Sequence, residues 1–213
     1  MSRFLSLSLA GLVLAGPAVA QPSRERALVD LRDQGSIETR RHGAQRLGET
    51  GTMGDVPALV EALRDSDALV RALAERAMWE VWSRSGDEQA DRLLAIGIEQ
   101  MTAREPEAAI ETFSRVIDRR PDFAEGWNKR ATVYFLVGEY RKSLADCDQV
   151  MKRNPLHFGA LSGYGTIYML LGQPDKALDY FERALAINPN LHQVEETVEE
   201  LRRLLHQRRK DTI

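Results

Sequence analysis

A clear hydrophobic periodicity lies near the C-terminus of the chain. Val194, Val198, Leu201 and Leu205 follow one another at steps of four, three and four residues, which places them in one stripe along a helix. Glutamates occupy the start of this stretch and arginines its end, the order that complements a helix macrodipole. The pattern predicts a capping helix over 192–210 whose apolar side faces the preceding part of the chain.

The middle of the chain repeats itself at a fixed step. Pro121, Pro155 and Pro189 are spaced by 34 residues. Four more columns keep the same step: Leu93, Trp127 and Leu161; Gly97, Ala131 and Gly165; Ala109, Ser143 and Ala177; Phe113, Cys147 and Phe181. Small residues in two columns let one helix approach the other of a pair. Five columns in phase indicate tandem helical hairpins.

This 34-residue unit resembles the tetratricopeptide repeat, and the resemblance implies three repeats within 88–191, at 90–123, 124–157 and 158–191. Gly138 and Gly172 stand where each first helix must stop and reverse. Pro106 and Pro174 begin second helices, where the missing amide proton is not needed. The first unit departs from the pattern, with Arg104 in its turn.

Residues 23–86 carry a different and weaker echo. Leu31-Arg32-Asp33 recurs as Leu63-Arg64-Asp65, and the stretch 55–71 resembles a bacterial HEAT-type repeat. Asp67 is expected to cap a second helix, and Trp79 and Trp82 to fill an irregular seam where the repeat type changes. The fold class is therefore all-α, a right-handed α-solenoid in which HEAT-like pairs precede a tetratricopeptide superhelix. One continuous superhelix over 23–210 is the natural outcome.

The first twenty residues have the pattern of a signal peptide. Arg3 is followed by an uncharged stretch from Phe4 to Ala20, and Ala18-Val19-Ala20 offers the small-x-small pattern for cleavage. The alternative is a retained anchor, but the apolar run is shorter than the roughly 20 residues that a spanning helix needs. We expect residues 1–20 to be removed, no membrane span afterwards, and export, to the periplasm if the source is a Gram-negative bacterium.

Composition narrows the function classes. Of 213 residues, 43% are hydrophobic and 29% charged, with a net charge of −3, which is typical of a soluble globular protein. The chain lacks the basic excess that binding to nucleic acid requires.

No catalytic or cofactor-binding motif accompanies the repeats. The chain contains no Gly-x-Ser-x-Gly, phosphate-loop, His-Glu-x-x-His or Cys-x-x-Cys sequence. The four histidines, His42, His157, His192 and His206, show no ligand spacing and are interpreted as surface or turn residues. Cys147 is interpreted as a buried apolar substitute for the phenylalanines of its column. We therefore predict no enzyme, no cofactor and no metal site.

The tetratricopeptide resemblance implies a concave groove lined by the first helix of each pair. Its projected lining is Leu94, Ile98, Met101, Asn128, Lys129, Thr132, Phe135, Ser162, Thr166 and Met169. This mixed, mostly apolar surface suits an extended segment or a partner helix. The family's carboxylate clamp for acidic chaperone tails needs cations where Gly159 and Gly163 stand, so chaperone-tail binding is disfavoured.

Gly159 and Gly163 are the last feature of the groove. A glycine inside a helix destabilises it by roughly 1 kcal/mol relative to alanine. The missing side chains either open a pocket beside Ser162 or allow close helix packing. The overall prediction is an exported, non-enzymatic protein-interaction module, an adaptor or scaffold in the cell envelope that binds a protein or peptide partner. The alternatives are a structural subunit using its convex face and, less favoured, an enzyme with an unrecognised site.

Overall fold

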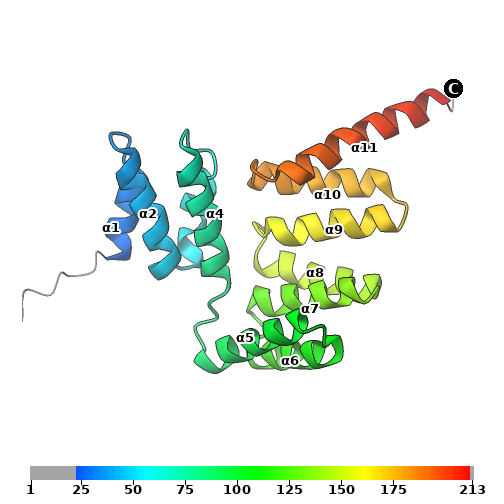
Figure 1. Cartoon of the computed structure of the whole chain (residues 1–213), viewed down its shortest axis with the longest axis horizontal. Coiled ribbons are helices and arrows are strands. Elements are labelled where there is room, and N and C mark those ends of the chain that lie inside the picture. Colours follow the sequence, from blue (N-terminus) through cyan, green and yellow to red (C-terminus); the bar gives the residue numbers. More distant parts are fainter. Residues whose placement is uncertain (1–22, 212–213) are drawn as a thin grey trace, which may run out of the picture.

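The computed structural model describes residues 23–211, and the regular structure of this part of the chain consists of helices, without strands (Figure 1). The helices in chain order are α1 (Arg24–Leu31), α2 (Ile37–Thr50), α3 (Val56–Ala62), α4 (Ala68–Trp82), α5 (Glu88–Thr102), α6 (Pro106–Arg119), α7 (Ala124–Leu136), α8 (Tyr140–Arg153), α9 (Phe158–Leu170), α10 (Pro174–Ile187) and α11 (His192–Asp211), with a 3₁₀ turn at Met53–Asp55. The predicted all-α class is confirmed. The predicted signal peptide lies outside the described residues and stays a prediction.

Side chains that the sequence places at helix starts act as caps. The Asp67 carboxylate accepts a hydrogen bond from the Val70 backbone N–H at 2.9 Å, as predicted, and Asp87 accepts one from the Ala90 N–H at 2.9 Å at the start of α5. Pro106 and Pro174 are the first residues of α6 and α10. These caps set the boundaries of the helices that build the array.

The turns inside the hairpins adopt left-handed backbone geometry. Gly138 and Gly172 have φ values of 79° and 67°. Arg104 takes the same place in the first hairpin at φ 62°, where its Cβ makes the conformation more costly than for glycine. The departure noted in the sequence therefore keeps the turn geometry at the cost of local strain.

Helices α5 to α11 form antiparallel neighbours that stack in one row (Figure 1). Close approach within a pair depends on the small residues of the repeat. A Cβ added at Gly97 would lie 2.4 Å from the Phe113 ring, and one at Gly165 would lie 2.5 Å from the Phe181 ring. The glycine and phenylalanine columns are thus two sides of the same contact. Val198, Leu201 and Leu205 of α11 are buried, so its apolar stripe faces inward.

The N-terminal helices α1 to α4 do not continue this row. They form a block of their own, and α4 lies beside the start of α9 and the end of α10 (Figure 1). Trp82 and Met78 of α4 share one buried cluster with Phe158 and Leu161 of α9. The single continuous superhelix expected from the sequence is therefore replaced by a block that folds back onto the array, because the tryptophans bury their surface against α9.

Polar groups also join the N-terminal block to the array. We call this interface between α4 and the ends of α9 and α10 the seam. The Arg71 Nε donates to Asn190 Oδ1 at 3.0 Å, and Asn190 Nδ2 donates to the Leu63 carbonyl at 2.8 Å. Arg64 donates to the carbonyl of Ile187 at the end of α10. Trp79 and Trp82 fill an irregular seam, as predicted, although its other side is α9.

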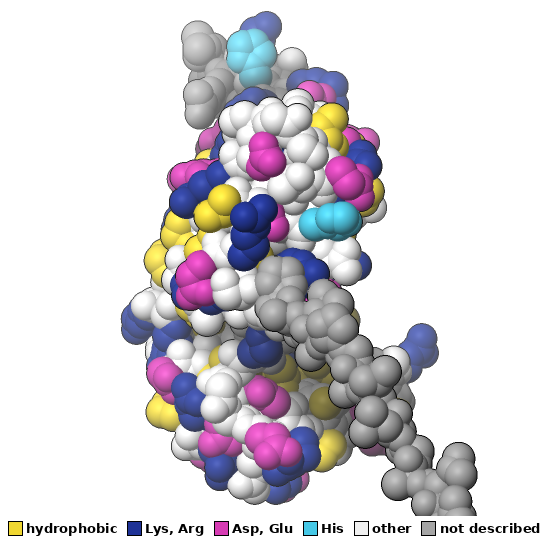
Figure 2. Space-filling view, turned by 90° about the vertical axis from the view of Figure 1, so that its left-hand side faces the viewer, with side chains coloured by type: hydrophobic (Ala, Val, Ile, Leu, Met, Phe, Trp, Pro, Cys, Tyr) yellow, Lys and Arg dark blue, Asp and Glu magenta, His cyan; other side chains and the backbone are white. Residues whose placement is uncertain are grey.

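Charged side chains of both signs are mixed over the side of the molecule that carries the N-terminal block (Figure 2). No helix among residues 23–211 combines the length and apolar character needed to cross a membrane.

Candidate functional site: a pocket between α7 and α9

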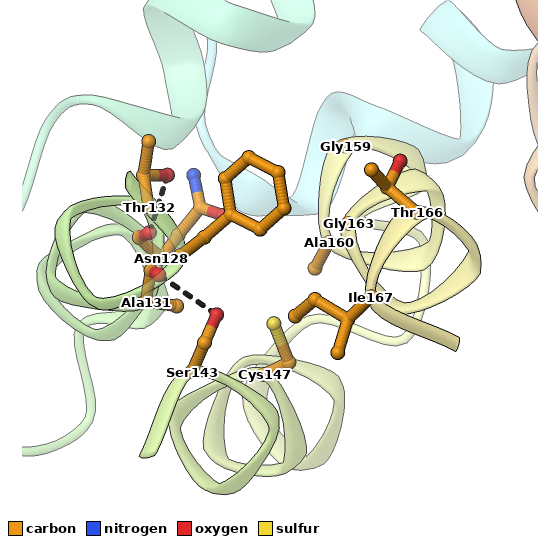
Figure 3. Close-up of a pocket in the computed structure, with 11 residues that line it drawn as sticks. Asn128, Ala131, Thr132, Ser143, Cys147, Gly159, Ala160, Gly163, Thr166 and Ile167 are labelled. Carbon is orange, nitrogen blue, oxygen red and sulfur yellow. Dashed lines mark hydrogen bonds between the residues drawn. The ribbon is translucent and has the colours of Figure 1, made fainter. Parts of the chain in front are cut away.

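A pocket of about 170 Å³ lies between α7 and α9, with α8 as its floor (Figure 3). Its lining is Asn128, Ala131, Thr132 and Phe135 from α7, Ser143 and Cys147 from α8, and Gly159, Ala160, Gly163, Thr166 and Ile167 from α9. None of these residues is charged. The site is therefore a neutral hollow on the face formed by the first helices of two successive hairpins.

The two glycines of α9 have different roles. A Cβ added at Gly163 would have no atom within 4 Å, apart from its own helix backbone, so the missing side chain leaves open space in the pocket. A Cβ added at Gly159 would lie 2.6 Å from Cη2 of Trp79 on α4. Gly163 thus agrees with the pocket hypothesis, and Gly159 agrees with the close-packing alternative.

The hydroxyl groups of the lining are already paired with backbone carbonyls. Thr132 donates to the Asn128 carbonyl at 2.9 Å, and Ser143 donates to the Ala131 carbonyl at 2.8 Å. Thr166 makes the same contact with the Ser162 carbonyl at 3.0 Å. Because the hydroxyl protons are used in this way, the pocket has fewer polar groups to offer than its composition suggests.

Asn128 is positioned by a buried hydrogen-bond network. Its Nδ2 donates to Glu125 Oε2 at 3.1 Å, and the fully buried His157 contacts the same oxygen through Nε2 at 3.1 Å. His157 Nδ1 accepts the Ala160 backbone N–H at 3.1 Å, which places the ring proton of neutral His157 on Nε2. Lys129 completes the network at 3.0 Å from Glu125 Oε1.

The network keeps a carboxylate ionised in the interior. Burial raises the pKa of Glu125, but the hydrogen bond from His157 and the charge and hydrogen bond of Lys129 outweigh burial and leave that pKa below its ordinary value. Trp82 stacks on the His157 ring at 4.5 Å between centroids. The interpretation of His157 as a surface or turn residue is right about the turn and wrong about the surface: it lies at the turn before α9 and is fully buried, with Trp79 and Trp82 of α4 against its ring.

Cys147 is a protonated, structural residue of the pocket floor. Its side chain is buried, and burial followed by the charges of Asp146 and Asp148 raises the pKa of its thiol to about 12. The predicted buried apolar role is confirmed. Among the described residues no cluster of three or more His, Cys, Asp or Glu side chains is arranged to hold a metal ion.

The residues predicted to line the groove fall into three groups. Asn128, Thr132, Phe135 and Thr166 line the pocket. Met101 instead lines a separate hollow of about 440 Å³ with Leu136 and Val137, at the turns that end α5 and α7. The remaining predicted residues lie elsewhere and line neither hollow: Leu94, Ile98, Lys129, Ser162 and Met169.

The residues of the third group show that a repeat pattern alone does not predict which side chains reach the groove surface. Leu94 is only 3% exposed because it packs in the core with Phe113 and Phe123, so its assignment to the groove surface is corrected. Ile98 packs partly against the same cluster. Lys129 turns to Glu125, Ser162 donates to the Phe158 carbonyl, and Met169 is 44% exposed.

Sequence reasoning missed part of the pocket. Ala131, Ser143 and Cys147 belong to repeat columns and were explained by helix packing alone. Ala160 and Ile167 carry no signal of their own in the sequence. A column that mixes sizes, such as Phe113, Cys147 and Phe181, is the one available hint, because a small residue among large ones leaves space.

Comparisons with known proteins agree with this architecture. Two family models, both described as tetratricopeptide repeat, match residues 94–148 and 160–191. A TPR repeat-containing protein of Rhizobium etli is 37% identical over 108 residues, which cover 51% of this chain and 53% of that protein. Anaphase-promoting complex subunit 3 of Schizosaccharomyces pombe is 31% identical over 87 residues, which cover 41% of this chain and 13% of that protein. The chain thus spans about half or less of these two relatives.

Solved structures share the fold of the array. The first TPR of Spaghetti (RPAP3), bound to an HSP90 peptide, superposes with a TM-score of 0.54 at 22% identity, covering 56% of this chain and 96% of that one. The Sgt2 TPR domain from Aspergillus fumigatus gives a TM-score of 0.54 at 18% identity, covering 58% and 83%. The chain therefore contains tetratricopeptide repeats. The HEAT-like resemblance of residues 23–86 stays a prediction.

Proposed function

We propose that this protein is a non-enzymatic interaction module that binds a segment or helix of a partner polypeptide in the pocket between α7 and α9. The observation that carries the proposal is the pocket itself: three successive helices, α7, α8 and α9, enclose a neutral hollow at the place where Gly163 provides no side chain. A similar solved tetratricopeptide domain is described as bound to an HSP90 peptide, which supports a polypeptide as the ligand class.

The chemistry around the pocket favours binding over catalysis. The Glu125 carboxylate is ionised and engaged by Asn128, Lys129 and His157, and the Cys147 thiol is protonated at neutral pH. A general base or a nucleophile needs a free, accessible group. Glu125 instead joins α7 to the turn before α9 through His157, and Cys147 is packed in the floor of the pocket.

The pocket differs from a site for acidic tails because it offers no unpaired positive charge among its lining residues. Lys129 is paired with Glu125, and Arg130 is paired with Asp146 at 2.7 Å. Neither cation is among the lining residues. An acidic partner tail would find little compensation here for the water that it loses, so a neutral segment is the favoured ligand.

Export of the module is part of the proposal and rests on the sequence of residues 1–20. In this setting the protein acts as an adaptor or scaffold of the cell envelope. N-terminal sequencing of the protein recovered from a cell-envelope fraction tests it: a mature chain that begins at Gln21 is expected. An uncleaved chain recovered with the cytoplasmic proteins would contradict export and leave the binding proposal in place.

Site-specific photo-crosslinking in living cells tests the binding proposal. A photoreactive residue at position 132 points from α7 into the pocket, and the exposed position 145 on α8 is the matched control. We expect a discrete crosslinked polypeptide from position 132 that is absent from position 145. Capture from position 145 alone would instead favour the alternative, a structural subunit that uses its convex face.

A further inference from the structure

The geometry points to a specific anchor: we infer that the pocket takes one uncharged, apolar side chain of the partner, of leucine or phenylalanine size, inserted between Gly163 and Cys147. The inference rests on the proposed function and specifies the chemistry of the same site. It commits to a neutral polypeptide segment as the occupant.

The size of the pocket sets the size of the anchor. Its volume is about 170 Å³. A cavity of about 150 Å³ lined by Leu, Ile and Phe accommodates benzene. One aromatic ring or one branched aliphatic group therefore fills the space, whereas a methyl group would leave most of it empty.

The walls determine the polarity of the anchor. Ala160, Gly163 and Ile167 provide aliphatic surface from α9, and Phe135 provides a ring from α7. The hydroxyls of Thr132 and Thr166 donate to backbone carbonyls and leave their methyl groups as lining. A carboxylate or ammonium group placed here would lose its water without gaining a counter-ion.

The seam with α4 fixes where the anchor lies along α9. Trp79 occupies the space beside Gly159 and so blocks that end of the hollow. One turn later, the space beside Gly163 is open. The anchor therefore sits at Gly163 and Thr166, and Trp79 of α4 bounds the site beside Gly159.

Small neutral probes test the anchor without knowledge of the partner. N-acetyl-phenylalanine amide, N-acetyl-leucine amide and N-acetyl-glutamate amide are titrated into the isotopically labelled full chain, and the backbone amide signals of Gly163 and Thr166 are followed by NMR. We expect the phenylalanine and leucine probes to bind at least about tenfold more tightly than the glutamate probe, a difference that desolvation of one charge easily provides.

Filling the pocket is the second arm of the test. Gly163→Leu is expected to abolish the shifts caused by the neutral probes, because the new side chain occupies the open space. Ala145→Leu adds a comparable group to an exposed position of α8 and is expected to leave probe binding unchanged. Thr166→Leu fills the pocket from a second position of α9 and keeps the test valid if Gly163→Leu does not fold.

Three results would overturn the anchor: equal binding of the glutamate probe, shifts that do not localise to Gly163 and Thr166, or probe binding that survives both filling variants. Any of these with a polypeptide still captured from position 132 leaves the proposed function standing and removes only the anchor. Neutral probes that bind as expected, without any capture in cells, would instead count against the proposed function.

Discussion

At the start of α9 the Trp79 ring fills the space beside Gly159, whereas one turn later the space beside Gly163 is open. The first site belongs to the seam between the N-terminal block and the array, and the second belongs to the pocket. Both glycines lie on the same helix, where glycine is less favourable than alanine. Their different environments come from α4, which reaches one of them and not the other.

The comparison shows that an unfavourable residue in a helix can be retained for two unrelated reasons. In the seam the small residue permits contact within the molecule, and its replacement should cost stability. In the pocket it leaves an open space, and if a partner binds there as we propose, its replacement should cost binding. Variants of the seam and of the array separate these two outcomes, starting with the largest expected effect.

Trp82→Ala removes the centre of the seam. The Trp82 side chain is 3% exposed and lies 5.2 Å from the Phe158 ring, centroid to centroid. We expect the free energy of unfolding to fall by about 3–5 kcal/mol, the usual cost of deleting a buried large aromatic side chain. Urea unfolding followed by circular dichroism measures it.

Trp127→Ala is the matched control, because Trp127 is half-buried at the surface of the array, with Arg130 and Arg153 over its ring. Its loss should be clearly smaller. Equal losses for the two variants would show that the seam contributes no more to stability than a half-buried surface contact.

Gly159→Ala crowds the seam. The new Cβ would lie 2.6 Å from the Trp79 ring, so the ring must move or the helices must separate. We expect a net destabilisation of about 1–3 kcal/mol, because overpacking outweighs the helix preference of alanine. Urea unfolding gives the loss, and a change in tryptophan fluorescence of the folded protein locates it. An unchanged stability would mean that α4 is not tightly seated on α9.

Gly163→Ala is the counterpart in the pocket. The added methyl group meets no neighbouring atom, so the variant should gain up to about 1 kcal/mol of stability from helix propensity alone. The melting temperature measures this gain. The same variant should weaken binding of the neutral probes by reducing the pocket volume. A raised melting temperature together with undiminished probe binding would argue against the pocket as a binding site.

Charge pairs in the two regions provide the smallest and most pH-dependent effect. Hydrogen bonds from Arg41 and then from the Val70 N–H lower the pKa of Asp67 to about 2 from its ordinary 3.8. A lowered pKa contributes stability above the unfolded value, and the contribution is lost as the pH falls from about 4 to 2. Asp67→Asn should remove this contribution. The melting temperature of the variant should therefore fall less steeply between pH 5 and pH 2 than that of the unsubstituted protein.

Asp87 is the matching residue of the array, with a pKa lowered to about 2 by Arg119. If the seam joins both regions into one cooperative unit, Asp67→Asn and Asp87→Asn should each lower the same single transition at neutral pH. Two separate transitions, each sensitive to one variant, would show that the N-terminal block unfolds independently of the array.

Much of the array could be predicted from the sequence because its determinants are local or periodic. The spacing of Pro121, Pro155 and Pro189 gave the hairpin repeat, and Asp67 was recognised as a cap from the helix that follows it. The buried role of Cys147 followed from its column. In these cases the neighbours along the chain, or one repeat away, carry the information.

The site could be predicted only in part. Asn128, Thr132, Phe135 and Thr166 were placed on the pocket face, but Leu94 was misplaced because a helix face alone does not show how deeply the next hairpin covers it. The burial of His157 could not be predicted, since the ring that covers it, Trp82, comes from a segment with no periodic relation to α9.

The sequence by itself determined the helices, their caps, the hairpin step and the small residues that let helices approach, since each of these depends on residues close in the chain or in phase with it. Only the tertiary structure decided where the N-terminal block sits, which glycine is packed and which is open, and which side chains meet in the pocket. Such contacts join segments far apart in sequence, and their free energy depends on complementary shapes that no local pattern encodes.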